Sequence, residues 1–199
     1  YAVMAERGFM DKSVLDTYGS FKACIPGHPD MHKVPGIEMS TGSLGQGISA
    51  AGGMALANKL DNDPGRIYVL LGDGEIQEGI VWEALMSAAH YKLDNMVAIL
   101  DHNGLQIDGK NEDVMTVAPV VEKFQAFGWN VIQIDGHDFE QILDAFKQAR
   151  ACKGKPTMIV AETIKGKGVS FMENNAGWHG KAPDEEQTKQ ALAELGGEF

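Results

Sequence analysis

Residues 67–74 read IYVLLGDG, a short apolar run of β-prone residues that ends with two glycines around an aspartate. Such a run predicts a buried strand that stops at Gly72. Residues 80–92 then have the apolar spacing of a helix, and residues 96–100 form a second apolar run. Because strands that alternate with helices form crossover units, this stretch predicts a parallel sheet.

The same alternation continues toward the C-terminus. Residues 117–127 predict a helix, residues 131–134 a third strand and residues 157–163 a fourth. The sequence therefore predicts an α/β fold with a mostly parallel sheet and helices on both faces. Between the last two strands, Asp138 is expected to cap a helix whose apolar residues recur at helical spacing, namely Phe139, Ile142, Leu143, Phe146 and Ala149.

The composition argues against several classes of protein. The chain has 199 residues and a formal net charge of −11, so it is long enough for one α/β domain and lacks the positive charge that nucleic acid binding needs. No run of about 18 apolar residues predicts a membrane-spanning helix, and the first residues lack the apolar core of an export signal. We therefore expect a cytoplasmic protein that binds neither nucleic acid nor membrane, with Cys24 and Cys152 as reduced thiols.

The chain is expected to form a single domain over residues 1–199. Tyr1 already lies in a stretch with helical spacing, which predicts that the N-terminal segment is incomplete. Residues 184–199 predict a C-terminal helix and a short tail.

Small, acidic, amide and basic residues follow the predicted strands. In open α/β sheets, ligands gather beyond the carboxyl ends of the strands, so these residues are expected to share one rim that forms a binding site. They are residues 72–74, 101–104, 135–138 and 165–168.

A hard cation is the first ligand that this rim could bind. Mg²⁺ prefers oxygen ligands, and Asp73 offers a carboxylate, Asn103 an amide oxygen and Leu105 a backbone carbonyl. Gly72 and Gly74 would let the backbone approach a phosphate, near a helix N-terminus that favours anions. The residues alone leave a simpler interpretation open, which is a strand-to-helix turn with a solvated aspartate.

A second glycine-rich segment, residues 40–47 with the sequence STGSLGQG, precedes a run of small residues that reaches Ala57. Glycines before a helix allow a flat ligand to approach closely, and Leu44 could support a ring from below. Tight packing of a helix of small residues is the alternative interpretation, and the residues alone leave it open.

Two of the six histidines stand out because their loops contain residues that stiffen or open the chain. His28 lies in PGHP and His179 in GWHGK, and either could present an imidazole to a cleft. His90 falls within a predicted helix and is expected to pack there, whereas His137 is expected to be a surface or capping group in its turn. The other two histidines receive no role.

Four stretches together resemble transketolases. They read GHPDMHKVPGIEMSTGSLGQGISAAGGMALA at 27–57, LLGDGEIQEGIVWEAL at 70–85, YKLDNMVAILDHNGLQIDG at 91–109 and TIKGKGVSFMENNAGWHGKAP at 163–183. The resemblance runs over residues 1–183, and the TGSLGQG segment argues against 1-deoxyxylulose-5-phosphate synthase.

The resemblance implies a thiamine diphosphate-binding fold that holds this cofactor through Mg²⁺, which Ca²⁺ or Mn²⁺ could replace. Asp73, Asn103 and the Leu105 carbonyl would bind the metal. The residues that would contact the cofactor are Gly42, Ser43, Leu44, Gly72, Asp73, Gly74, Asn103, Lys165 and His179.

Three residues would act in catalysis if the resemblance holds. His28 resembles the histidine that meets the ketose donor near its C1 hydroxyl, and His179 resembles one that lies near both the cofactor diphosphate and the substrate. Glu78 resembles the acidic residue that links the two cofactors of the assembly across a subunit interface, although acidic residues near a helix start also interact favourably with the helix dipole.

The activity that the resemblance implies is that of a transketolase of the pentose phosphate pathway, which moves a two-carbon ketol unit between sugar phosphates, from a ketose to an aldose. The glutamate that activates the cofactor ring in this family lies in a pyrimidine-binding domain, which these residues do not include. We therefore expect one subunit of a split, hetero-oligomeric enzyme, whose partner subunit carries the pyrimidine-binding and C-terminal domains, and we expect self-association.

Two alternatives stay open. The chain could be half of another thiamine diphosphate enzyme, similar to dihydroxyacetone synthase or to 1-deoxyxylulose-5-phosphate synthase. It could also be a catalytically idle module for cofactor binding or assembly.

Overall fold

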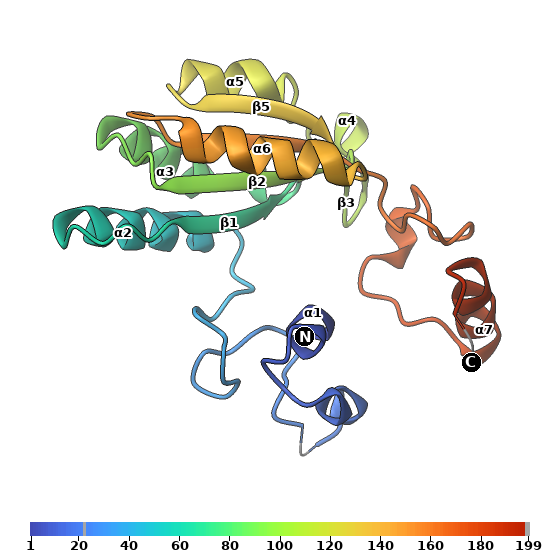
Figure 1. Cartoon of the computed structure of the whole chain (residues 1–199). Coiled ribbons are helices and arrows are strands. Elements are labelled where there is room, and N and C mark those ends of the chain that lie inside the picture. Colours follow the sequence, from blue (N-terminus) through green and yellow to red (C-terminus); the bar gives the residue numbers. More distant parts are fainter. Residues whose placement is uncertain (22, 198–199) are drawn as a thin grey trace. The chain divides into compact units, whose positions relative to one another are not determined.

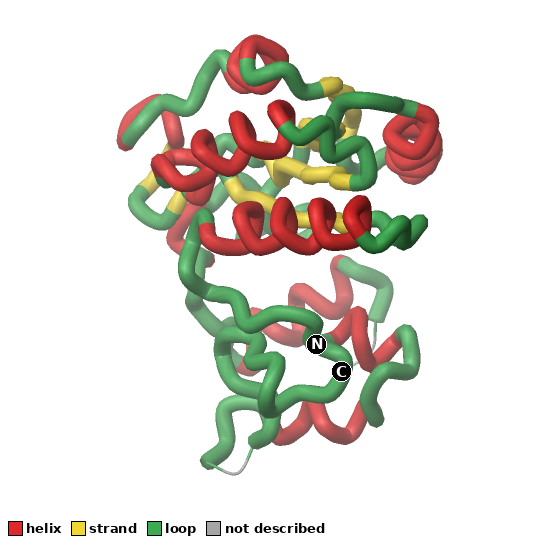
Figure 2. The backbone as a smooth tube through the Cα atoms, turned by 90° about the vertical axis from the view of Figure 1, so that its left-hand side faces the viewer, coloured by secondary structure: helices red, strands yellow, loops and turns green. Residues whose placement is uncertain are grey.

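The computed structural model describes residues 1–21 and 23–197, so the end of the predicted C-terminal tail lies outside the described residues. The chain divides into two compact units, Tyr1–Gly47 and Ile48–Phe199. In the first unit, α1 spans Ala2–Glu6 and the 3₁₀ helix η1 spans Lys12–Thr17, and the rest is turns and loops. All strands of the described residues belong to the second unit (Figure 2).

The second unit is built on a four-stranded sheet, in which every pair of neighbouring strands is parallel (Figure 1). The strands follow the spatial order β1-β2-β6-β5. This sheet confirms the mostly parallel architecture predicted from the alternation of apolar runs. Its strands are β1 (Ile67–Gly72), β2 (Met96–His102), β5 (Asn130–Asp135) and β6 (Thr157–Glu162).

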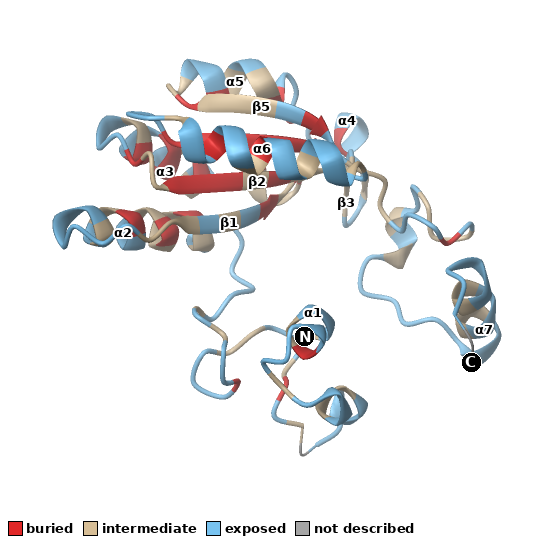
Figure 3. Cartoon of the chain, in the orientation of Figure 1, coloured by how far each residue is buried: buried red, intermediate tan, exposed pale blue. Residues whose placement is uncertain are grey.

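Helices cover both faces of the sheet, as predicted. On one face, buried residues of α2 (Gln46–Leu60), α3 (Gly79–His90) and α5 (Val120–Ala126) form a single core with residues from β1, β2 and β6. On the other face, α6 (Phe139–Ala151) forms a smaller core with β2, β5 and β6. Figure 3 shows that β2 is buried along most of its length, as is expected for a central strand between two helical layers.

Two helices differ from the sequence prediction. The helix predicted from residue 117 begins at Val120, with Pro119 at its N-cap position, because a proline disfavours helical backbone in the residue before it. Asp138 caps α6 as predicted and accepts hydrogen bonds from the backbone amides of Glu140 and Gln141. However, Phe139 and Leu143 are 80% and 67% exposed, so the apolar spacing of α6 overstates its buried face.

The remaining elements are short, except for the C-terminal helix. Among the described residues, no helix is long and apolar enough to cross a membrane. These elements are η2 (Glu75–Gln77), β3 (Leu105–Gln106), β4 (Gly109–Lys110), α4 (Asn111–Val114), η3 (Ala176–Trp178) and α7 (Glu185–Glu194).

Candidate functional site

The carboxyl ends of the strands are aligned and carry most of the predicted site. In the strand register, Gly72 at the end of β1 lies beside Asp101 of β2, and His102 lies beside Glu162 of β6. Glu162 in turn lies beside Asp135 of β5. The polar residues after the strands therefore meet at one rim, as the topology predicted.

Asp73 is the most deeply buried of these polar residues, with 2% of its surface exposed. Its Oδ1 accepts a hydrogen bond of 2.6 Å from Nδ1 of His102, and its Oδ2 accepts one of 2.6 Å from the Gly104 amide. The interpretation of Asp73 as a solvated turn residue is therefore wrong. A buried carboxylate needs such donors, since an unpaired buried charge is costly.

The contact with Asp73 also changes the acid–base behaviour of His102. The hydrogen bond to Asp73 raises the pKa of His102, and the negative charges of Asp73, Glu162 and Asp101 raise it further. Desolvation opposes this shift, but the net direction is upward. The imidazolium form of His102 is thus favoured beside the Asp73 carboxylate.

The oxygen atoms predicted to bind Mg²⁺ lie on adjoining segments. The Gly104 amide that binds Asp73 stands between Asn103 and Leu105, and Asn103 Oδ1 accepts a hydrogen bond of 3.0 Å from the Leu105 amide. A carboxylate or amide oxygen that accepts one hydrogen bond keeps a further lone pair. Carboxylate, amide and carbonyl oxygens are the ligands that Mg²⁺ prefers, so the residues present fit the metal.

Of the two glycines flanking Asp73, Gly72 leaves open space for a ligand. A Cβ atom built on Gly72 would meet nothing within 4 Å, and one on Gly74 would lie 3.5 Å from Cβ of Gln106. Gly74 is also the N-cap residue of η2, whose first residue is Glu75. The open backbone at Gly72 is consistent with the approach of a phosphate, which the sequence predicted there.

A cavity of about 440 Å³ lies at the same rim. Asn103 and Lys165 both line it, together with Asp101 and Thr163. The Thr163 hydroxyl donates a hydrogen bond to Asp101 Oδ1, and the Thr163 amide donates one of 3.1 Å to the carbonyl of His102. The predicted metal ligand and the predicted basic residue thus share one cavity.

In the first unit, hydrogen bonds connect the loop that carries His28 to the loop that carries Gly42. The Met31 amide donates to the Ser40 hydroxyl at 3.1 Å, and the Thr41 amide donates to the carbonyl of Pro29 at 3.1 Å. Gly42 has a φ of +121°, and a Cβ atom there would lie 2.7 Å from Cγ of the His28 ring. Both the φ angle and the ring contact therefore require glycine at position 42.

The neighbouring residues Ser43 and Leu44 are exposed, and Leu44 has 56% of its surface accessible. The Gln46 amide donates to the Ser43 carbonyl at 3.2 Å, and α2 starts at Gln46. This segment therefore presents an apolar side chain just before α2, and support of a flat ring by Leu44 stays a prediction.

His179 and Glu78 both lie at the ends of helices and are exposed. His179 follows η3, and η3 contacts β4 of the hairpin that comes directly after Asn103. Glu78 is the N-cap residue of α3, and its side chain makes no capping hydrogen bond. A helix-capping role therefore does not explain the glutamate at position 78.

Several contacts of the rim were missed from the sequence. His102 was left without a role and binds Asp73. His137 is exposed, as expected for a surface residue, but its hydrogen bond was missed: its Nε2 accepts the Ile164 amide at 2.8 Å. Asp101 and Thr163, which bind each other, were not singled out as a pair. Their positions at or just after the carboxyl ends of β2, β5 and β6 were the available signal.

Comparisons with known proteins give the family. The family described as transketolase, thiamine diphosphate binding domain, matches residues 1–198. The chain is 46% identical to a 6-deoxy-6-sulfo-D-fructose transketolase subunit of Clostridium sp. (strain MSTE9). The alignment spans 195 residues, which are 98% of this chain and 71% of that protein. It is 44% identical to an apulose-4-phosphate transketolase subunit of Phocaeicola vulgatus, over 98% of this chain and 69% of that protein.

Longer transketolases contain the same unit as a fraction of their length. The chain is 42% identical to transketolase of Homo sapiens over 98% of this chain and 31% of that protein. The crystal structure of transketolase from Campylobacter jejuni superposes with a TM-score of 0.86 at 36% identity, over 94% of this chain and 30% of that one. The chain therefore belongs to the thiamine diphosphate-binding domain family of transketolases.

Proposed function

We propose that this chain is the cofactor-anchoring subunit of a transketolase that transfers a two-carbon ketol unit from a ketose phosphate to an aldose phosphate. The observation that carries the proposal is the cluster of Asp73, Gly104 and Asn103 at the ends of β1 and β2. In a member of this family, such a cluster offers oxygen ligands for a metal that would neutralise a diphosphate.

The cofactor and the metal have distinct places in this proposal. Asp73, Asn103 and the Leu105 carbonyl would hold Mg²⁺, and Ca²⁺ or Mn²⁺ could replace it. Backbone groups at Gly72 and Gly74 would lie against the diphosphate. Bound thiamine diphosphate would supply the nucleophile and the electron sink for breaking the ketose C2–C3 bond, whereas the protein supplies position and charge.

Basic groups near the diphosphate would act locally against an unfavourable overall charge. The chain has a formal net charge of −11, which repels anionic cofactors and sugar phosphates at long range. Lys165 lines the cavity with Asn103 and would place an ammonium group near the diphosphate. A single lysine at short range can outweigh distant acidic residues, because salt screens charges more than about 10 Å away.

Two histidines would handle protons and hydroxyl groups of the substrate. We propose that His28 meets the C1 hydroxyl of the ketose donor, supported by its place on a loop fastened to the predicted cofactor-pocket residue Gly42. His179 would lie near both diphosphate and sugar, supported by the contact between η3 and the hairpin after Asn103.

The donor class is inferred from relatives. Solved structures of Pichia stipitis transketolase, 31–33% identical to this chain, are described as complexes with xylulose 5-phosphate, sedoheptulose 7-phosphate and fructose 6-phosphate. The relatives named as subunits carry the names of apulose 4-phosphate and 6-deoxy-6-sulfo-D-fructose. We therefore propose a phosphorylated or sulfonated ketose as donor.

We further propose that activity needs a second polypeptide with the pyrimidine-binding and C-terminal domains. Three relatives of which the chain covers 69–71% are named as subunits, which supports this division. Exposed Glu78, free of a capping role, would lie at the subunit interface and link the two cofactor sites.

The decisive experiment measures ketol transfer by the purified chain with thiamine diphosphate, Mg²⁺ and each of these five donors, with and without the candidate partner. We expect transfer to an aldose phosphate only in the mixture. Full activity of the chain alone would contradict the split enzyme. Transfer to formaldehyde in preference to aldose phosphates would indicate a dihydroxyacetone synthase instead, and cofactor binding without transfer in any mixture would indicate an idle module.

A further inference from the structure

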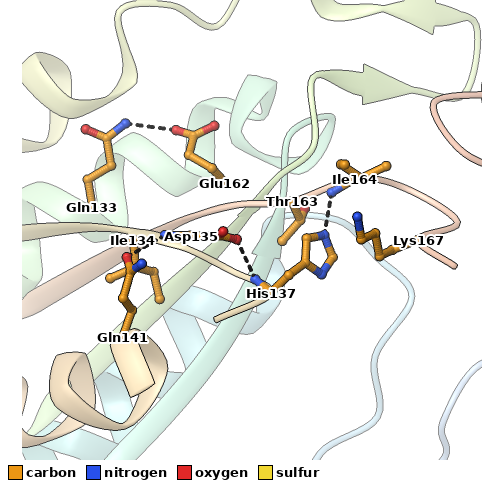
Figure 4. Close-up of a pocket in the computed structure, with 9 residues that line it drawn as sticks. All are labelled: Gln133, Ile134, Asp135, His137, Gln141, Glu162, Thr163, Ile164 and Lys167. Atoms are coloured by element: carbon orange, nitrogen blue, oxygen red, sulfur yellow. Dashed lines mark hydrogen bonds between the residues drawn. The ribbon is translucent and has the colours of Figure 1, made fainter. Parts of the chain in front are cut away.

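His137 joins the loops that follow β5 and β6. Its Nε2 accepts a hydrogen bond of 2.8 Å from the backbone amide of Ile164, and its own amide donates one of 2.8 Å to Asp135 Oδ1 (Figure 4). Because Nε2 accepts, this ring nitrogen carries no proton, and the proton of the neutral imidazole is on Nδ1. His137 lines both the 440 Å³ cavity and a neighbouring cavity of about 640 Å³.

Gly136 explains how His137 reaches Ile164. The Gly136 amide donates to the carbonyl of Glu162 at 2.8 Å. A Cβ atom on Gly136 would lie 3.1 Å from both the Ala161 Cβ and the Glu162 carbonyl oxygen, and it would also collide with Thr163. Only glycine allows the end of β5 to lie this close to the end of β6, and this closeness brings the next residue, His137, against the Ile164 amide.

Capping of α6 does not account for His137. Asp138 fills that role, since its carboxylate accepts the backbone amides of Glu140 and Gln141. The hydrogen bond that the His137 side chain makes is directed to Ile164, in the loop after β6. Its imidazole therefore acts on the loop after β6.

In this loop, hydrogen bonds hold both residues that precede Lys165. The Thr163 amide and hydroxyl bind the carbonyl of His102 and the carboxylate of Asp101, and the Ile164 amide binds His137. The next residue, Lys165, lines the cavity that Asn103 also lines. Gly166 then turns the chain with a φ of +75°. The contact with His137 thus holds the amide side of the residue before Lys165, while the Lys165 carbonyl accepts the Asn174 amide at 3.0 Å.

We propose that His137 is a positioning residue for the diphosphate site: by accepting the Ile164 amide, it fixes the backbone from which Lys165 reaches the cavity. This inference rests on the proposed function, in which Lys165 approaches the diphosphate. It adds a residue that acts on the backbone before Lys165 and so on the geometry of the group proposed to meet the diphosphate.

The test is a double-mutant cycle on the full 199-residue chain. Binding of inorganic pyrophosphate in the presence of Mg²⁺ is measured by calorimetry for wild type, His137→Ala, Lys165→Ala and the double variant. We expect His137→Ala to weaken binding by about fivefold and Lys165→Ala by about tenfold, the sizes expected for losing a neutral and a charged hydrogen bond. The double variant should bind like Lys165→Ala, because His137 acts through Lys165.

Two further variants separate positioning from general loss of structure. His137→Gln places an amide oxygen near the position of Nε2, so it should recover most of the affinity. His90→Ala removes a histidine that packs edge-on against Tyr91 and should leave pyrophosphate affinity unchanged. Amide hydrogen exchange at Ile164 should be faster in His137→Ala and close to wild type in His137→Gln.

The outcomes distinguish failure of this inference from failure of the proposed function. If Lys165→Ala weakens binding but His137→Ala does not, or if the two losses are independent and add, the positioning role is refuted while the diphosphate site stands. If wild type binds no pyrophosphate, or if Lys165→Ala binds it as wild type does, the diphosphate role of this cavity and the positioning role fall together.

Discussion

At the scale of single residues, Asp73 has a structural role and a proposed role as a metal ligand. Its buried carboxylate accepts His102 Nδ1 and the Gly104 amide, each at 2.6 Å. The same carboxylate is the one acidic ligand in the proposed magnesium site. Among the described residues, no group of three or more histidines, cysteines and acidic residues could hold a metal, so the site depends on this single charge.

We expect Asp73→Ala to weaken Mg²⁺-dependent binding of thiamine diphosphate by at least about tenfold, since even residues outside the first coordination sphere have effects of this size. The fold should lose about 1–3 kcal/mol, because the partners of Asp73 are left unpaired. Calorimetry with and without Mg²⁺ measures the first effect and thermal unfolding the second. Asp108→Ala, an exposed aspartate in the following hairpin, is the control. A variant at Asp73 that kept the wild-type magnesium dependence would disprove the assignment.

His28 and His179 should differ in which step they affect. His28→Ala is expected to lower kcat with ketose donors by about 100-fold, a typical contribution of a residue that transfers protons, with little change in cofactor affinity. His179→Ala should reduce both, because its proposed place is between diphosphate and sugar. Steady-state kinetics of the reconstituted enzyme and cofactor titrations separate these effects. Equal cofactor affinities for wild type and His179→Ala would contradict the second assignment.

At the scale of elements, the first unit depends on two loops that fit against each other. The loop at Pro29 and Met31 binds the loop at Ser40 and Thr41 through two hydrogen bonds of 3.1 Å, and the His28 ring packs on Gly42. The position of a proposed catalytic histidine therefore depends on a glycine 14 residues away in the sequence.

Gly42→Ala should displace His28, because the new methyl group would lie 2.7 Å from the imidazole ring. The φ of +121° adds strain, so we expect a loss of about 1 kcal/mol or more in stability. Turnover of ketose donors should fall more than cofactor affinity does. Gly52→Ala in α2 is a matched control, since a Cβ atom there meets nothing within 4 Å and alanine favours helix. Equal turnover in the two variants would argue against the contact between the loops as the determinant of His28 position.

At the scale of the whole molecule, Asp94 connects segments that are far apart in the sequence of the second unit. Its carboxylate binds Lys59 at the end of α2 at 2.7 Å and the Gly154 amide at 2.8 Å. Its carbonyl accepts the Arg66 guanidinium, which also binds the carbonyl of Arg150. Burial raises the pKa of Asp94, but the hydrogen bonds from Gly154 and Lys59 and the charge of Lys59 lower it more, so the net direction is downward.

This downward shift gives the stability a defined pH dependence. Because the pKa of folded Asp94 lies below that of the unfolded chain, its contribution is present above the ordinary value near pH 4 and is lost as the pH falls through the folded pKa. We expect Asp94→Asn to lower the melting temperature at pH 7 and to approach wild type as the pH falls through the lowered pKa of Asp94. Thermal unfolding of both proteins across this range tests the prediction. A difference that did not shrink in acid would mean that packing, not charge, accounts for the effect.

Sequence periodicity was sufficient to predict the layers of the second unit. The apolar runs gave β1, β2, β5 and β6 to within a residue or two, and the parallel sheet with helices on both faces followed from their alternation with helices. This succeeded because burial of a strand or helix face depends on residues close together in the chain. The expectation of one rim with Asp73 and Asn103 together came from the same topology.

The partners of individual side chains depended on the tertiary structure. His102 binds Asp73 from 29 positions away, and the His137 imidazole accepts an amide 27 positions away, so neither contact leaves a local pattern. Leu143 has helical apolar spacing and is still 67% exposed. Periodicity specifies which face of an element is apolar, whereas hydrogen-bond partners and the covered part of that face depend on strand register and on which elements pack together.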